Sequence, residues 1–231
     1  MIVVVASQWN KGATSFASRW PSGEAGVLTP RDLSIAGWRQ RVSAQDWGSV
    51  VVEGRAVSET EITGVLTMLP DVYDRELVHI NPGDRRFVAS EMTAFLLFWL
   101  SRLECPVLNR PTAACLSGPS WRNEYWIYTA AKMGIPVRPV QRSTNPSSPL
   151  NVVEAAPTIL TVVGEQVVGD ADPVLKQHAI NLCRTAEVEL LSLQFSGAER
   201  DARLVGVDVF PDLADDAVAT AVVEYLRGTL L

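Results

Sequence analysis

The sequence predicts an α/β protein in which an N-terminal parallel, Rossmann-like sheet with helices on both faces precedes a smaller α+β part with antiparallel strands. Up to about residue 140, short β-branched runs such as residues 2–6 alternate with helical patterns, as in parallel sheets. Beyond residue 150, apolar and polar residues alternate around short turns, which is typical of antiparallel strands.

The N-terminal part is expected to contain several buried strands, because its short apolar runs are bounded by polar or turn-forming residues. These strands are predicted at residues 2–6, 26–28, 49–53, 61–69, 106–109 and 135–138. Longer apolar patterns predict helices over residues 90–102 and 121–133. The second helix is expected to end at Gly134, because Pro136 follows shortly after.

A change of composition marks the boundary between the two parts. Residues 141–150 are polar and rich in proline and serine, which predicts a linker between a domain of residues 1–140 and a domain of residues 151–231. In the second domain, strands 158–163 and 166–168 flank the turn Gly164-Glu165. A helix over 173–186, antiparallel strands at 191–195 and 205–209, and a closing helix over 214–227 complete the prediction.

Composition excludes several classes of function. The chain has 231 residues, of which 47% are hydrophobic, and a net charge of −6, which argues against a protein that binds nucleic acid by neutralising phosphates. Three cysteines without CxxC spacing argue against a disulfide scaffold or a zinc ribbon. The apolar start lacks a basic segment, and no apolar run is long enough to span a bilayer. We therefore expect a cytoplasmic protein.

The loop of residues 105–126 is the candidate ligand site, because open α/β sheets bind ligands beyond the carboxyl ends of their strands. The two arginines of this loop could clamp a carboxylate or a phosphate. The alternative is structural: Ser120 caps the following helix, Pro119 fixes its start and Trp121 packs on the sheet. It is favoured for each residue singly, and it is weighted equally with ligand binding for Arg110 and Arg122 together. The candidate ligand-binding residues are Asn109, Arg110, Ser117, Gly118, Trp121, Arg122 and Asn123, with Trp9 and Lys11 from the loop after the first strand.

Other reactive side chains favour structural interpretations. Cys115 has no neighbouring histidine in the sequence and is interpreted as a packed thiol, so no catalytic residue is predicted. Asp208 is a weak metal candidate, although an outward-facing strand residue explains it equally well. The aromatic residues of the helix over 121–133 lie on several faces, so part of that surface is expected to contact a protein partner or a second copy in a homodimer.

The order of these motifs resembles a known superfamily. A parallel α/β domain, then Asn109-Arg110-Pro111, then a helix ending in Gly134-Ile135-Pro136, is similar to the pre-ATP-grasp domain of ATP-grasp enzymes. Glutathione synthetase and the ribosomal-protein glutamate ligases are the most similar in style. The segment TVVGEQVVG, a helix, LLSLQF and VGVDVF resemble the C-terminal grasp region of that superfamily. The resemblance implies ATP- and Mg²⁺-dependent joining of a carboxylate to an amine.

The departures from the family pattern predict a truncated member without the nucleotide-binding lid. Only about 25 residues separate Gly134 from Ile159, where the family has a far longer lid segment. Asn123 stands where the family usually has a lysine, and Asp208 lacks the paired Glu and Asn of the family's metal motif. Phosphoryl transfer needs such cationic groups.

The main hypothesis is therefore a degenerate, non-catalytic pseudoenzyme without a cofactor. It binds a small anionic ligand or acts as an accessory partner of a biosynthetic or modifying enzyme. The alternative is an ATP-dependent carboxylate–amine ligase component that another subunit completes, and only this alternative requires ATP and Mg²⁺. A Rossmann-like enzyme using the 105–126 loop ranks last, because the chain has no GxGxxG or GxxxxGK[ST] motif.

Overall fold

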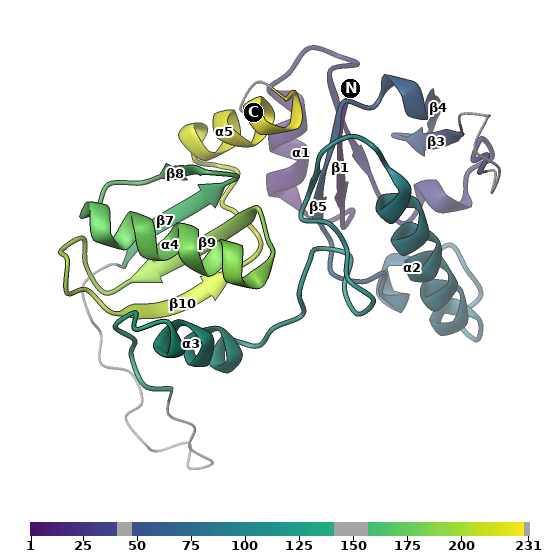
Figure 1. The fold of residues 1–231 in the computed structure, drawn as a ribbon. Helices are drawn as coiled ribbons and strands as arrows, with labels where there is room; N and C mark the ends of the chain where they lie inside the picture. Colours follow the sequence, from purple (N-terminus) through teal and green to yellow (C-terminus); the bar gives the residue numbers. More distant parts are fainter. Residues whose placement is uncertain (41–47, 141–156, 229–231) are drawn as a thin grey trace. The chain divides into compact units, whose positions relative to one another are not determined.

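A computed structural model of the chain describes residues 1–40, 48–140 and 157–228. The chain forms two compact units: unit 1 consists of Met1–Ser120 and Asp212–Leu231, and unit 2 of Trp121–Pro211. Unit 1 contains a four-stranded parallel sheet and unit 2 a four-stranded antiparallel sheet (Figure 1). The predicted fold class is thus confirmed. Among the described residues, no helix has both the length and the apolar character needed to cross a membrane.

The parallel sheet of unit 1 has the strand order β2-β1-β5-β6. Its strands are β1 (Ile2–Ala6), β2 (Ala25–Leu28), β5 (Gly64–Met68) and β6 (Val107–Leu108). Every residue of β1 is buried, as expected for the β-branched run of a central parallel strand. The sheet therefore fixes the positions of the loops that follow β1, β5 and β6.

Helices cover both faces of this sheet, as predicted (Figure 1). The side of Val3, Val5 and Val65 packs in one core with α2 (Arg85–Arg102). The opposite side carries α1 (Lys11–Ser18) and α5 (Asp216–Leu226), and Gly64 lets α5 approach closely, because a Cβ there would lie 2.6 Å from the Leu226 carbonyl oxygen. Arg19 ties the two helices together through an ion pair with Asp216 at 2.9 Å.

The predicted parallel strand at 49–53 is instead part of a hairpin. β3 (Ser49–Val52) pairs antiparallel with β4 (Arg55–Ser58), which the sequence did not predict. Short 3₁₀ turns complete unit 1 at η1 (Asp32–Ser34), η2 (Glu59–Glu61) and η3 (Asp74–Glu76). Val50 and Val52 of β3 belong to the same apolar core as α2, so burial in this core explains the apolar run without membership of the parallel sheet.

Unit 2 has the strand order β10-β9-β7-β8. Its strands are β7 (Thr158–Val163), β8 (Gln166–Val168), β9 (Leu190–Phe195) and β10 (Leu204–Asp208), and the predicted hairpin and antiparallel pair are confirmed. Leu160, Leu191 and Leu193 form one core with α3 (Asn123–Lys132) and α4 (Pro173–Ala186). Both helices therefore pack on the same side of the sheet.

Two expectations about the chain's organisation and one helix boundary differ from the structure. Residues 135–138 form no strand of the parallel sheet, because Val137 makes a single bridge with Leu204 of unit 2. The predicted domains place α3 in the first part and α5 in the second, whereas α3 packs on β10 and α5 on β5. The predicted linker at 141–150 lies outside the described residues. Residues 85–89 also belong to α2, which begins five residues before the predicted start at residue 90.

Candidate functional site

The loop after β6 is fixed to the end of β5. The Ser117 hydroxyl donates a hydrogen bond to the Leu69 carbonyl oxygen at 3.0 Å, and the Leu116 amide donates to the Pro70 carbonyl oxygen at 2.8 Å. Ser117 is completely buried. Its hydroxyl is therefore a structural tie at the carboxyl edge of the sheet, and it does not face solvent.

Asn109 and Gly118 meet inside this loop. Asn109 is 2% exposed, and a Cβ added at Gly118 would lie 3.1 Å from the Asn109 Cβ. Gly118 also has a φ of 98°, which side chains rarely adopt, and its carbonyl oxygen accepts from the Thr112 hydroxyl at 3.0 Å. The loop is thus a compact corner in which glycine is required for both space and conformation.

Arg110 is anchored to the end of α2. Its guanidinium donates to the Leu103 carbonyl oxygen at 3.2 Å and to the Cys105 carbonyl oxygen at 3.3 Å. Cations at a helix C-terminus satisfy carbonyls that have no partner within the helix. The side chain remains exposed, and a guanidinium carries five N–H donors, so Arg110 combines a structural role with capacity for an anionic ligand.

The loop after β1 contributes exposed side chains at the same edge. Trp9 is 54% exposed, and Lys11 begins α1 and is also exposed. Between them, the Asn10 side chain accepts from the Ala13 amide at 3.0 Å and caps the helix. Gln8 donates to the Glu76 carbonyl oxygen at 3.1 Å, which joins this loop to η3.

Two buried polar groups in unit 1 were missed by the sequence analysis. Glu76 is 1% exposed, and its Oε2 has no hydrogen-bond partner. Thr67, near the carboxyl end of β5, is 1% exposed, and its hydroxyl is also unpartnered. Nothing in the local sequence distinguishes Glu76 from the neighbouring acids that are solvated, because its burial arises from η3 packing beside α2.

Burial also raises the pKa of two groups in the loops after β5 and β6. Desolvation raises the pKa of Asp71. Burial likewise raises the pKa of the Cys115 thiol, and the nearby Asp71 charge adds a smaller contribution in the same direction. The thiol is therefore held in its unreactive protonated form, consistent with its interpretation as a packed residue.

Three of the candidate residues belong to unit 2, because the chain passes from unit 1 to unit 2 after Ser120. Trp121 packs edge-to-face against Tyr125 and at a tilt against Trp126, with ring centroids 4.6 and 4.5 Å apart. Arg122 is the N-cap residue of α3, and Asn123 is its first residue. The expected cap by Ser120 was therefore wrong. The exposed Arg122 side chain makes no cap hydrogen bond.

Asp208 ends β10 and forms a local turn. One carboxylate oxygen accepts from the Phe210 amide at 2.9 Å. In the described part of the chain, no group of three or more His, Cys, Asp or Glu residues is arranged to hold a metal ion. Asp208 therefore makes a contact with the backbone, and no cluster of metal-ligating side chains among the described residues includes it.

Several solved structures, ATP-grasp ligases among them, are similar in fold to this chain. Macrocyclase MdnC from Microcystis aeruginosa MRC, bound to precursor peptide MdnA, superposes with a TM-score of 0.69 at 11% identity, covering 99% of this chain and 100% of that one. Ligase PsnB with a precursor variant, Mg and ADP gives 0.65 at 11% identity, covering 100% and 98%. The chain has an ATP-grasp-like fold.

A third similar structure is the Chryseobacterium gregarium RiPP-associated ATP-grasp ligase, in complex with ADP and a leader and core peptide. Its TM-score is 0.62 at 8% identity, covering 99% of this chain and 97% of the ligase. No family model matches the sequence. No curated protein matches it either. The ATP-grasp-like resemblance is therefore confirmed at the level of fold, and the predicted truncation remains a prediction.

Proposed function

We propose that this chain is a non-catalytic, ATP-grasp-like accessory protein that binds an anionic peptide segment for a peptide-modifying ligase. The observation that carries the proposal is the short connection between α3 and β7. About 25 residues join Lys132 to Thr158, whereas the resemblance implies a much longer nucleotide-binding lid at this place. A chain without that lid lacks the cationic clamp on which phosphoryl transfer depends.

The side chains near this connection support the same proposal. Asn123 begins α3 in the register where the resemblance implies a lysine. Asp208, in the strand where the family places metal ligands, is occupied with the Phe210 amide. Position 123 thus carries a neutral amide where the resemblance implies a cation, and the Asp208 carboxylate is hydrogen-bonded to a backbone amide.

Peptide recognition is supported by the ligands of the structural neighbours. Macrocyclase MdnC was crystallised with a precursor peptide, and the Chryseobacterium gregarium ligase with a leader and a core peptide. In this chain Arg110 and Arg122 are exposed, and guanidinium groups bind carboxylates in bidentate fashion. An acidic peptide is therefore the ligand chemistry that each of these two side chains fits by itself.

Nucleotide titration tests the non-catalytic part of the proposal. Isothermal titration calorimetry with Mg-ATP and Mg-ADP is expected to give no binding heat. Micromolar affinity for either nucleotide would overturn the proposal and favour the ligase alternative. Two observations support that alternative. The chain covers 97% of the Chryseobacterium gregarium ligase, and it contains the strands β7 to β10, which resemble the grasp region.

Peptide binding is tested separately with a fluorescein-labelled hexaglutamate peptide. Fluorescence anisotropy should show binding at low salt that weakens at least fivefold in Arg122→Ala. The control is Arg200→Ala, another exposed arginine of unit 2, which should bind as the unmodified chain does. Equal weakening in both variants would show unspecific charge attraction and remove the support for this site.

A further inference from the structure

The turn between β9 and β10 borders a pocket that the site described above does not use. The pocket has a volume of about 290 Å³ and is lined by Arg138, Ser196, Glu199, Asp201, Ala202 and Arg203. All six residues belong to unit 2, so the pocket is complete within that unit. Asp208, in the strand where the resemblance implies metal ligands, lies at the other end of β10. The pocket is therefore distinct from the position of the family's metal motif.

Hydrogen bonds of the backbone hold the residues that line this pocket. The Ser196 amide donates to the Arg203 carbonyl oxygen at 2.9 Å, and the Arg203 amide donates to the Ser196 hydroxyl oxygen at 3.0 Å. These two bonds close the base of the turn. The Arg138 amide donates to the Leu204 carbonyl oxygen at 2.9 Å, which holds this arginine beside the start of β10. The backbone around the pocket is thus ordered before a ligand binds, which lowers the entropy cost of binding.

The charged side chains of the turn do not pair with one another. In the described part of the chain, the carboxylates of Glu199 and Asp201 and the guanidinium of Arg203 take part in no hydrogen bond or ion pair. All three side chains are exposed. The Ser196 hydroxyl oxygen accepts from the Arg203 amide, so its own O–H is left to donate to a ligand. Groups of both charges are therefore available in one small cavity.

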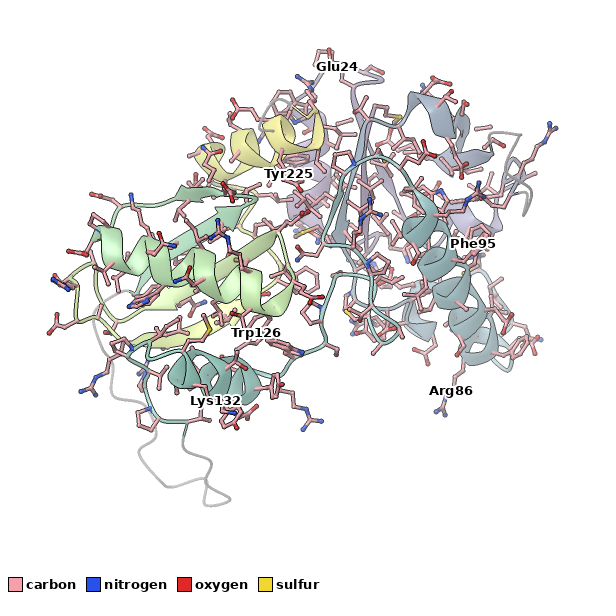
Figure 2. The ribbon with its side chains drawn as sticks, viewed as in Figure 1. Glu24, Arg86, Phe95, Trp126, Lys132 and Tyr225 are labelled. Atoms are coloured by element: carbon pink, nitrogen blue, oxygen red, sulfur yellow. The ribbon has the colours of Figure 1, made fainter. Side chains whose placement is uncertain are left out.

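The size and the charge of the pocket restrict the class of ligand. A volume of about 290 Å³ lies at the lower end of ligand pockets, which measure about 300–1,000 Å³, and this favours a small metabolite over a nucleotide. The only apolar residue of the lining is Ala202, which belongs to the same core as Trp126 (Figure 2). Two arginines and two acids have no net charge together, so a simple anion or a simple cation meets repulsion as well as attraction. A small zwitterion satisfies both kinds of group.

From these features we propose that the pocket binds a free α-amino acid with a small side chain. Its carboxylate is held by the guanidinium groups of Arg138 and Arg203, which suit carboxylates. Its ammonium group donates to the carboxylates of Glu199 and Asp201. The proposal does not depend on the proposed peptide binding, because none of these residues belongs to that site. Exposed ion pairs contribute little each, so we expect a dissociation constant on the order of 1 mM.

Three probes of similar size test the class of ligand. L-Alanine carries both charges, propionate lacks the ammonium group, and ethylamine lacks the carboxylate. In ¹H–¹⁵N correlation spectra of the full chain at matched ionic strength, L-alanine should shift the amide signals of residues 196–203. Propionate and ethylamine should bind about tenfold more weakly or less, because each leaves one pair of charges without a partner. No shift with L-alanine up to about 20 mM, or equal affinity for either analogue, would overturn the proposal.

Two substitutions of similar shape test the roles of the lining residues. Arg203→Gln and Asp201→Asn should each weaken L-alanine binding about fivefold or more, because each removes one charge from the pocket. Asp201→Asn should not weaken propionate binding, since propionate has no ammonium group. The control is Arg200→Gln, an exposed arginine of the same turn that does not line the pocket and should leave L-alanine affinity unchanged. Unchanged affinity in both pocket variants, or equal weakening in the control, would reject the site.

Discussion

The indole N–H of Trp99 donates a buried hydrogen bond to Oε1 of Glu59 at 3.0 Å. This bond joins the C-terminal end of α2 to η2, which follows the β3–β4 hairpin. The same carboxylate accepts from the Gln40 side chain at 2.7 Å and from the Gly48 amide at 3.1 Å. Glu59 therefore organises the part of unit 1 that lies beyond the parallel sheet.

Replacing Glu59 should destabilise unit 1 strongly. Glu59→Ala leaves the Trp99 indole and the Gly48 amide without an acceptor, so we expect a loss of about 3 kcal/mol in the free energy of unfolding. Urea unfolding followed by tryptophan fluorescence measures this loss. Glu165→Ala is the control, because its ion pair with Arg184 is exposed and should contribute less than about 0.5 kcal/mol. Equal effects in the two variants would contradict the role of Glu59.

The elements of the two units differ in how far the sequence predicts them. Strands β1, β5, β7 and β9 were predicted because their short runs are rich in β-branched residues or alternate with period two, and polar or turn-forming residues bound them. The unit to which α3 and α5 belong was not predictable, because an amphipathic helix shows that one face is buried but not which sheet buries it. Likewise, nothing in the sequence marks Glu59 and Glu76 as buried acids. Glu59 is buried beside Trp99 of α2, and Glu76 is buried because η3 packs beside α2.

Two buried threonines should respond oppositely to the same substitution. The Thr67 hydroxyl is buried without a partner, whereas the Thr161 hydroxyl is hydrogen-bonded to the Ser192 hydroxyl at 2.9 Å. Thr67→Val should raise the free energy of unfolding by about 1 kcal/mol, because it removes an unsatisfied group. Thr161→Val should lower it by a similar amount. Segment-resolved hydrogen exchange measures the stability of each unit separately. If Thr67→Val lowers the stability of unit 1, a buried water or ligand pairs with the Thr67 hydroxyl.

The three thiols should differ in reactivity in the order of their burial. Cys105 is half-buried, whereas Cys115 and Cys183 are buried, and burial raises the pKa of Cys183 to about 12. Burial raises the pKa of Cys105 and Cys115 as well, so accessibility decides the order, and Ellman's reagent at pH 8 should modify Cys105 first in the native protein. The other two thiols should react only after urea is added. Rapid modification of Cys115 would mean that the loop after β6 opens in solution.

Asp71 should make unit 1 less stable as the pH rises. Burial raises its pKa above the unfolded value of about 3.9, so the native state holds the proton more tightly than the unfolded state. Stability is then lost as the pH rises through the interval between the two pKa values, and the loss persists at neutral pH. Asp71→Asn should reduce the decrease in stability between pH 4 and pH 7, by less than about 1 kcal/mol because the group is partly exposed.

Substitutions of Arg110 and Arg122 should have different effects on stability and on peptide binding. Arg110 holds two carbonyls after α2, so Arg110→Ala should lower the free energy of unfolding by about 1 kcal/mol. Arg122→Ala should leave stability unchanged, because its side chain makes no cap hydrogen bond, and should weaken only the binding of the hexaglutamate peptide. Thermal unfolding and fluorescence anisotropy measure the two effects independently. If Arg122→Ala also unfolds several degrees earlier with unchanged peptide affinity, the start of α3 is a structural corner and the proposed anionic site does not include it.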